Sequence, residues 1–251
     1  MEERGRLDRG DGVELAWISQ PGLGPTVVFL PGFRSDMQGE KATYLAAFCR
    51  ERKAAFLRFD YSGHGASDGQ FVEGSIGRWA EDALAVIDHR TEGSLVLVGS
   101  SMGGWIALLA AVRRPERLAG LLGIAAAPDF TEALMWQAMT PTQQTSLLAE
   151  GSLAVESTYE PPLVITRLLI EEGRRHLLLG GPIPISCPVR LLHGQRDHDV
   201  PWETALLTAE RIAGEDVRVT LIKDGEHRLS RPQDLALLSS TLADLLGPDR
   251  G

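Results

Sequence analysis

Hydrophobic and polar residues alternate in blocks along the chain, with short apolar runs separated by longer segments of helical periodicity. The run Thr-Val-Val-Phe-Leu at residues 26–30 is typical of a buried strand. Between residues 75 and 89, Ile76, Trp79 and Ala83 fall on one face of a helix. These two signatures predict strands at 13–18, 26–30, 54–59, 94–98, 118–126, 189–193 and 217–222, and helices at 41–51, 75–89, 105–112, 202–212 and 233–246.

This alternation predicts the fold class α/β, with a doubly wound and mainly parallel central sheet. A turn-rich segment at residues 8–12 precedes the first strand, which indicates a hairpin at the sheet edge. The predicted elements divide the chain into an α/β core, residues 1–127 and 186–251, and an insertion, residues 128–185. The insertion is too long for a loop in a compact domain, so we expect it to form a helical lid.

Helix-boundary signals within the insertion predict three helices. N-terminal capping patterns mark the starts of the first two helices, and a glycine marks the end of the second. A proline pair marks the start of the third. The signals are Asp129 with Glu132, Thr140–Pro141 with Gln143 and Gly151, and Pro161–Pro162 with Gly173. On the first helix, Met135, Trp136 and Met139 share one face. That face either lines an apolar substrate pocket or attaches the lid to the core, and both interpretations stay open.

The most informative stretch runs from residue 94 to residue 105, where an apolar strand ends in Gly-Ser-Ser-Met-Gly and an apolar helix follows. In a strand–turn–helix, the motif Gly-x-Ser-x-Gly places its serine on a tight turn with the hydroxyl exposed. Glycine is needed on both sides because a β-carbon would collide with the neighbouring backbone. The free N–H groups and the dipole of the following helix favour a developing anion. The pattern therefore predicts Ser101 as a nucleophile.

A nucleophilic serine needs a general base and a carboxylate that orients this base. Of the six histidines, His227 lies directly after the last predicted strand, where a loop can return its imidazole to the serine. Asp197 lies on the loop that leaves the preceding strand, with Asp199 as the competing candidate. The chain order serine, acid, histidine is the one expected for a Gly-x-Ser-x-Gly sheet hydrolase.

An oxyanion formed at this serine needs hydrogen-bond donors. We expect the backbone N–H of Met102, directly after the nucleophile, and that of Phe33, in the loop after strand 26–30. The neighbouring Arg34 is a tentative pocket residue, together with the face of the first lid helix. No cysteine and histidine spacing suggests a metal site, so neither a metal nor a cofactor is expected.

Composition limits the partners and the location of the protein. A formal net charge of −9 over 251 residues argues against a surface for nucleic acid or anionic membranes. No apolar run reaches membrane-spanning length, and the first residues lack the apolar core of a signal peptide. Cys49 and Cys187 stand far apart, which favours a reducing compartment. We therefore expect a cytoplasmic protein, whose oligomeric state does not follow from the sequence.

The chain resembles the α/β-hydrolase-fold serine hydrolases over essentially its whole length. The pattern Gly-x-x-Asp-x-x-Val-Pro at residues 194–201 is similar to the acid loop of this superfamily, which favours Asp197 over Asp199. The segment 60–67 resembles its Asp-x-x-Gly-His-Gly-x-Ser turn, so the resemblance implies a structural role for His64. Segments 29–37, 58–63, 99–105 and 187–194 are similar to a subfamily of palmitoyl-protein thioesterases and acyl-glucuronide esterases with mitochondrial and bacterial members.

Two departures from the resemblance bear on these expectations. The oxyanion loop has Pro31 where many esterases of the superfamily carry histidine, although the donating N–H is unaffected. The N-terminus lacks the Arg- and Ser-rich presequence of a mitochondrial member, which favours a bacterial cytoplasmic version.

The resulting hypothesis is a serine hydrolase of carboxylic esters or thioesters. Ser101, Asp197 and His227 would form the triad, and the substrate would be an acyl ester or thioester, including an acylated protein. The same fold and triad also serve C–C bond hydrolysis and cofactor-free perhydrolysis. A ligand-binding sensor on a hydrolase scaffold is a further alternative, because a fold does not determine a function.

Overall fold

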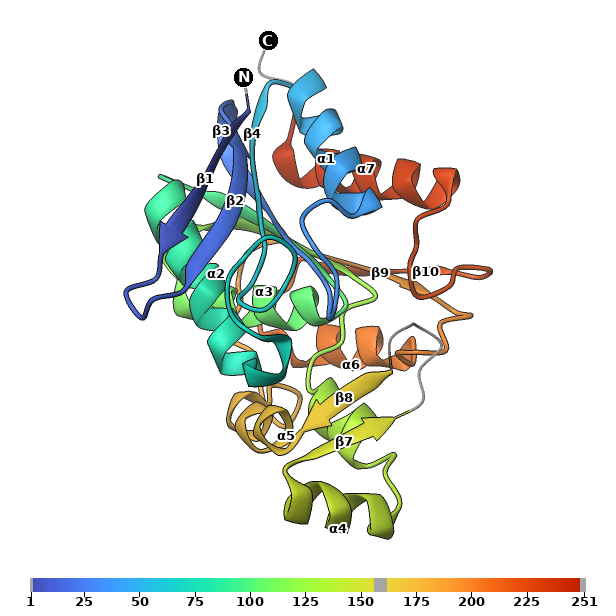
Figure 1. The fold of residues 1–251 in the computed structure, drawn as a ribbon. Helices are drawn as coiled ribbons and strands as arrows, with labels where there is room; N and C mark the ends of the chain where they lie inside the picture. The colour runs from blue at the N-terminus through green and yellow to red at the C-terminus, as the bar shows by residue number, and fades with distance from the viewer. Residues whose placement is uncertain (1, 156–161, 249–251) are drawn as a thin grey trace.

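A central sheet organises the molecule, which is described here by a computed structural model for residues 2–155 and 162–248 (Figure 1). Among these residues the sheet has eight strands in the order β1-β2-β4-β3-β5-β6-β9-β10. The strands from β4 to β10 in this order are parallel, whereas β2 pairs antiparallel with β4 and β1 antiparallel with β2. The bounds are β1 Glu3–Asp8, β2 Glu14–Gln20, β3 Leu23–Leu30, β4 Ala54–Phe59, β5 Leu95–Ser100, β6 Leu118–Ile124, β9 Val189–Gly194 and β10 Val217–Ile222.

Helices cover both faces of this sheet (Figure 1). One face packs against α1 and α7, through a core that includes Leu45 and Leu238, and the other packs against α2, α3 and α6. Strand β5 contributes to both cores, because Val96 faces the first and Leu97 the second. The helices are α1 Glu40–Glu51, α2 Ile76–Arg90, α3 Met102–Arg113, α6 Glu203–Arg211 and α7 Pro232–Leu246, with single 3₁₀ turns at η1 Phe71–Glu73 and η2 Pro115–Arg117.

This architecture confirms the predicted doubly wound, mainly parallel α/β fold. The edge hairpin expected around residues 8–12 forms between β1 and β2, with Asp8 paired to Glu14. No helix within residues 2–155 and 162–248 is long and apolar enough to cross a membrane.

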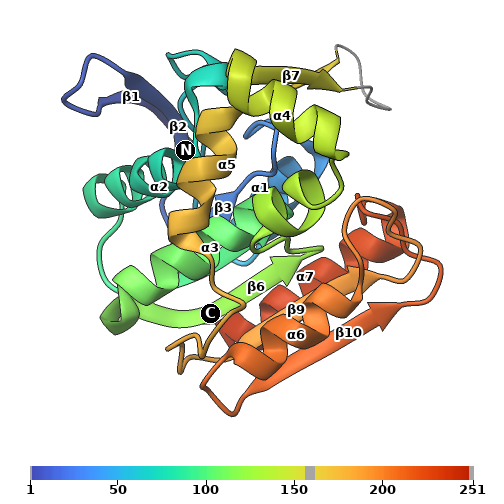
Figure 2. The same cartoon turned by 90° about the horizontal axis from the view of Figure 1, so that it is seen from below.

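The chain between β6 and β9 forms a separate layer of short elements, which we call the insertion. Figure 2 views the molecule from the side of this layer. Its elements are a π-helical segment η3 Thr131–Trp136, helix α4 Pro141–Glu150, strands β7 Ser152–Val155 and β8 Leu163–Thr166, helix α5 Arg167–Gly173 and the 3₁₀ turn η4 Arg174–His176. The insertion is anchored to the core where Glu172 accepts a hydrogen bond from the N–H of Gly77 at 2.9 Å and Trp105 donates to the carbonyl of His176 at 3.1 Å.

The second predicted helix of the insertion is confirmed, whereas the third was wrong over its first part. Thr140 and Gln143 form a reciprocal capping box, and Gly151 ends α4 with φ 83°. Residues 163–166, expected to be helical, instead form β8, which pairs antiparallel with β7. Their sequence Leu-Val-Ile-Thr favours a strand because three of its four residues, Val, Ile and Thr, are β-branched. The helix begins only at Arg167; Pro161, its predicted start, lies outside the described residues.

The first predicted helix is also corrected. Asp129 does not cap it: its carboxylate accepts hydrogen bonds from the N–H groups of Leu178 and Leu179, at 2.8 and 2.9 Å. Asp129 therefore joins the two ends of the insertion. Its backbone has φ 61°, in the left-handed region, and the following residues 131–136 wind as a π-helix. Asp129, with Glu132 three positions later, thus has the local pattern of a helix cap, but its carboxylate binds residues about 50 positions away. The local pattern does not distinguish these two roles.

Candidate active site

Ser101 occupies the sharp turn between β5 and α3, with φ 54° and ψ −120°. Positive φ is uncommon for a residue with a β-carbon and is found where the surrounding structure enforces it. Here the Ser101 N–H donates to the carbonyl of Ile124 at 2.9 Å, and its own carbonyl accepts from Gly104 and Ala127 at 2.8 and 3.1 Å. These bonds to β6 and α3 hold the turn from both sides.

The glycines of the motif are required by close approach of the backbone. A β-carbon on Gly99 would lie 2.2 Å from the carbonyl oxygen of Gly103, and one on Gly103 would lie 2.0 Å from that of Leu30. Neither contact is possible without moving a strand or the helix. The sequence Gly-x-Ser-x-Gly is therefore the composition that lets α3 start directly against β3 and β5.

Three side chains form a hydrogen-bonded chain at the carboxyl edge of the parallel strands. Nε2 of His227 lies 3.1 Å from Oγ of Ser101, and Nδ1 of His227 lies 2.8 Å from a carboxylate oxygen of Asp197. Since an ionised carboxylate only accepts, Nδ1–H donates to Asp197, and Nε2 is then left to accept the serine proton. The structure thus brings together the three residues predicted as a triad, which are 126 and 30 positions apart along the chain.

The Asp197 carboxylate is completely buried and fully hydrogen-bonded. One oxygen accepts the N–H groups of Asp199 and Val200, both at 2.9 Å, while the other accepts His227 and His193. Burial raises the pKa of the Asp197 carboxyl, but the hydrogen bonds from His193 and His227 outweigh burial and hold it well below its usual range. Asp197 is therefore ionised at neutral pH and oriented in one direction.

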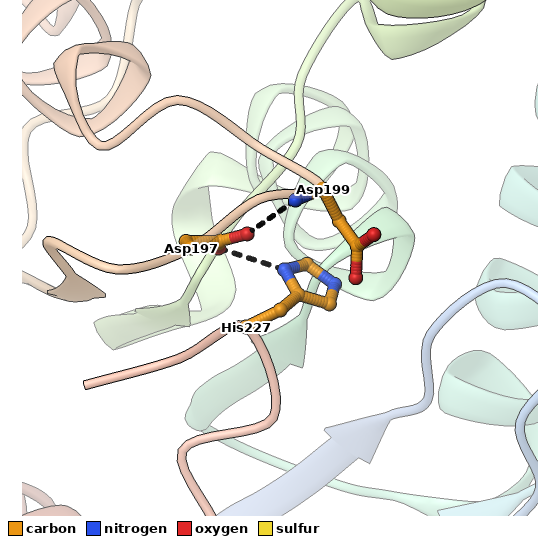
Figure 3. Close-up of side chains that lie close together, drawn as sticks. All are labelled: Asp197, Asp199 and His227. Atoms are coloured by element: carbon orange, nitrogen blue, oxygen red, sulfur yellow. Dashed lines mark hydrogen bonds and ion pairs between the residues drawn. The ribbon is translucent and has the colours of Figure 1, made fainter. Parts of the chain in front are cut away.

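Asp199 lies beside the same imidazole, and in Figure 3 its carboxylate is directed toward the ring of His227. One carboxylate oxygen each of Asp197 and Asp199 and one ring nitrogen of His227 lie within 4.8 Å of one another, a spacing that a bound cation could bridge. Both ring nitrogens of His227, however, are engaged, one by Asp197 and the other by Ser101. This arrangement suits proton transfer better than metal ligation, because a metal would have to displace one of these bonds.

The two expected oxyanion donors belong to segments that adjoin the nucleophile. Met102 is the first residue of α3, so its N–H has no partner within the helix. The loop carrying Phe33 touches the elbow, because a β-carbon on Gly32 would lie 3.3 Å from the carbonyl oxygen of Ser100 and 3.4 Å from Cβ of Ser101. The Phe33 ring makes edge contacts with Phe71, Trp79 and Phe130, which fix the loop against the core.

The family of the chain follows from comparison with known proteins. The model of the hydrolase family described as Serine aminopeptidase, S33 matches residues 24–167, which include the oxyanion loop and the serine elbow. This chain belongs to that hydrolase family. 

Relatives of this hydrolase match it over nearly its whole length. The palmitoyl-protein thioesterase ABHD10, mitochondrial, of Mus musculus is 42% identical over 242 residues, covering 96% of this chain and 81% of the relative. A solved structure of α/β-hydrolase domain-containing protein 10 from mouse superposes with a TM-score of 0.91 at 41% identity, covering 97% and 98% of the two chains. A putative hydrolase from Agrobacterium vitis S4 gives a TM-score of 0.93 at 38% identity, covering 98% and 99%.

One residue of the site escaped the sequence analysis of this hydrolase. His193 was not among the predicted site residues, yet its Nε2–H faces both the Asp197 carboxylate and the carbonyl of Val200, each at 3.1 Å. Its side chain is fully buried, and it is a second donor to the acid. The spacing of His193 and Asp197, four residues apart across a strand end, is the only signal that could have shown it.

His64 has the structural role implied by its motif. Its Nε2 accepts the backbone N–H of Arg34 at 3.3 Å, and its Nδ1 lies 3.2 Å from the carbonyl of Ser62, to which it donates. Burial lowers the pKa of the His64 imidazole, which keeps it neutral and able to accept. The residue thus supports the oxyanion loop, and its hydrogen bonds do not reach the triad.

The four tentative pocket residues of the hydrolase separate into two groups. Arg34 lines a cavity of about 340 Å³, together with His64, Phe71 and Val164 among others. Met135, Trp136 and Met139 instead pack within the insertion, in a small core with Leu147, Leu153, Val155, Leu163, Ile165 and Ile170. Met135 also packs against the main core, as expected if this face attaches the insertion to the core, and contact of these residues with substrate stays a prediction.

Substitution of the two acidic candidates distinguishes their roles. We expect Asp197→Asn to lower kcat by about 10⁴, because an amide in this position no longer imposes the productive tautomer of His227. Asp199→Asn should lower kcat much less, since the backbone N–H that Asp199 donates to Asp197 is retained by the substitution. Turnover of an activated ester, with thermal unfolding as the stability control, gives the ranking. The reverse order would assign the acid to Asp199.

Proposed function

We propose that this hydrolase cleaves carboxylic esters or thioesters through an acyl-enzyme on Ser101. The observation that carries the proposal is the hydrogen-bonded chain from Ser101 through His227 to Asp197, with distances of 3.1 and 2.8 Å. Its support comes from the free N–H at the start of α3 and from relatives named as thioesterases. C–C hydrolysis and perhydrolysis would use the same triad, so the relatives named as thioesterases are what favours ester or thioester cleavage over them.

The geometry supplies each step of acyl transfer. Ser101 Oγ attacks the acyl carbonyl carbon while Nε2 of His227 takes its proton, and Asp197 stabilises the imidazolium that forms. The negative charge on the former carbonyl oxygen is held by the N–H groups of Phe33 and Met102. Collapse expels the alcohol or thiol, protonated by His227, and leaves an acyl-serine. Water, deprotonated by His227, then attacks this ester and releases the carboxylic acid and the free serine.

Among possible substrates, we favour acyl thioesters, including acylated proteins. The family description names an aminopeptidase, but its match stops at residue 167, before the loops that carry Asp197 and His227. The thioesterase relative, by contrast, matches over 96% of the chain at 42% identity. A thiolate is also a better leaving group than an amine.

The cellular location and the lid role of the insertion are also proposals. Two free cysteines, Cys49 and Cys187, support a reducing compartment such as the cytoplasm. Strand β8 of the insertion contributes Leu163 and Val164 to the cavity that reaches Arg34. This cavity lies beside the loop of Phe33 and is not lined by a triad residue, so we propose that it extends the substrate site and that the insertion bounds it there, as a lid would.

Covalent labelling and turnover test the proposed function directly. Ser101→Ala should remain folded, lose labelling by a fluorophosphonate and lower kcat for p-nitrophenyl esters by about 10⁴–10⁶. An unchanged melting temperature would show that the loss is chemical. A variant that kept a tenth of the wild-type activity would overturn the assignment of the nucleophile.

A second experiment locates the acyl chain. Each buried methylene contributes about 0.8 kcal/mol, so four carbons favour the longer chain by roughly 3 kcal/mol, about two orders of magnitude in kcat/KM. Val164→Phe, which fills the cavity, should reduce kcat/KM for long acyl chains and spare short ones. Trp136→Ala tests whether the face of Met135, Trp136 and Met139 contacts the acyl chain. A shifted chain-length optimum would place the acyl chain against the first segment of the insertion.

If Trp136 only stabilises the insertion, its substitution should lower the melting temperature and depress all substrates in proportion. That outcome fits the packing of Trp136. The Arg174 guanidinium lies 4.7 Å from the centre of the Trp136 ring, and the backbone carbonyl of Trp136 accepts a hydrogen bond from Gln144. Leu148→Phe is the matched control for Val164→Phe, since Leu148 is 44% exposed on α4 and does not line the cavity. An unshifted profile in Val164→Phe would exclude the cavity as the acyl site.

A further inference from the structure

The loop that carries His227 is contacted by a lysine from the other end of the chain. We call residues 223–231, between β10 and α7, the base loop. Lys41, in the first turn of α1, donates a hydrogen bond from its ammonium group to the backbone carbonyl of Arg228, the residue directly after His227. The two partners are 187 positions apart in the sequence. This bond therefore joins the helix that follows the oxyanion loop to the loop of the general base.

The base loop is also secured at its two ends, and within it the Ser230 hydroxyl donates a second hydrogen bond to the carbonyl of Arg228, at 3.1 Å. Near its start, the N–H of Arg196 donates to the carbonyl of Gly225 at 2.8 Å. At its end, the Arg231 guanidinium binds Asp224 at 2.8 Å and Asp234 at 2.8 Å, which closes the loop onto α7. The bond from Lys41 acts in the segment between these clamps, where the imidazole is attached.

The backbone next to this contact is strained. Leu229, which follows Arg228, has φ 43°, in the left-handed region that side chains rarely adopt. Leu229 is buried in the core beneath α1 and α7, so the chain must turn sharply between the exposed loop and the core. A donor fixed to the carbonyl of Arg228 holds the peptide plane at the start of this turn, which in turn sets the direction of His227.

We propose that Lys41 is a positioning residue of this hydrolase, which holds the base loop so that His227 keeps its nitrogen directed at Ser101. The inference rests on the proposed function, because it assigns Lys41 a role in proton transfer by His227. It does not place Lys41 in contact with the substrate. The conformation of the loop, rather than the fold as a whole, is what the bond stabilises.

The charge of Lys41 makes this role dependent on pH. Burial lowers the pKa of the Lys41 ammonium to about 8. Glu40 on its own helix and Asp234 on α7 oppose this shift, whereas Arg228 on the base loop adds to it. A hydrogen bond from an ionised donor is roughly twice as strong as a neutral one, so the hold on Arg228 weakens as the ammonium loses its proton. We expect kcat to fall about fivefold above pH 8.

The stability of the protein changes in the opposite direction over this range. The pKa of Lys41 is lower in the folded protein than in the unfolded chain, so between the two values the unfolded chain binds more protons. The contribution of Lys41 to the free energy of unfolding therefore rises as the pH increases through this window. A loss of activity above pH 8 that is due to Lys41 is accordingly not a loss of folded protein.

Two variants of the full chain test the proposal by the pH profile of kcat for a short p-nitrophenyl ester. In Lys41→Arg the donor stays charged, so the decline above pH 8 should disappear. In Lys41→Met the donor is absent, so kcat should be about tenfold lower at all pH values, without the decline and with little change in KM. Lys53→Met, at an exposed position, is the matched control and should keep the wild-type profile.

A direct titration complements the kinetics. The chain has three lysines, so protein labelled with ¹³C at lysine Cε should give three resonances, and the one missing from Lys41→Arg identifies Lys41. Its titration midpoint should coincide with the decline in kcat. A wild-type decline that persists in both Lys41 variants would overturn the proposal while leaving the proposed function intact, provided that Ser101→Ala is inactive. An active Ser101→Ala would overturn both.

Discussion

The left-handed backbone of Ser101 is the constraint on which the rest of the site depends. A non-glycine residue in a sparsely populated region of φ and ψ costs about 1–3 kcal/mol, so its surroundings must enforce the conformation. Here β6 and α3 do so through hydrogen bonds to both backbone groups of the serine. Because Gly99 and Gly103 pack directly against neighbouring backbone, the Cα of Ser101 is held in place at the end of β5. Every other group of the site has to reach that position.

The buried charge of Asp197 also has to be stabilised within the site. Asp197 is a buried carboxylate, and an unpaired buried charge is strongly unfavourable. Four hydrogen bonds satisfy its two oxygens, and one of these bonds comes from His227 itself. The carboxylate can therefore stay ionised while the imidazole gains and loses a proton. His193 matters for the same reason, since it supplies a donor that does not depend on the state of His227.

Local sequence predicted those features that depend on neighbouring residues. Ser101 could be identified because the elbow is a continuous strand–turn–helix, and the parallel sheet because strands and helices alternate with regular spacing. The donor role of His193 and the anchoring role of Asp129 arise from contacts across a strand end or across 49 residues, which periodicity does not reveal. The strand at residues 163–166 was misassigned although its β-branched residues favour a strand, because the pairing with β7 that stabilises it is not visible in the local pattern. Assignment of Asp197 rather than Asp199 also needed more than chain order, since both residues lie on the same loop.

The insertion is packed separately from the strands that carry the triad loops. Strands β6 and β9 pair directly, with Leu121 opposite Val189, so the chain leaves and re-enters the sheet without disturbing its register. The insertion contacts α2 and α3 through α5 and η4, and it has its own small core around Leu147. Substitutions in that core act first on β8 and the cavity beside Arg34, whereas the Asp197 and His227 loops belong to the other strands. If the insertion bounds the substrate site as proposed, specificity and chemistry belong to separately packed parts of the same chain, and one can change without the other.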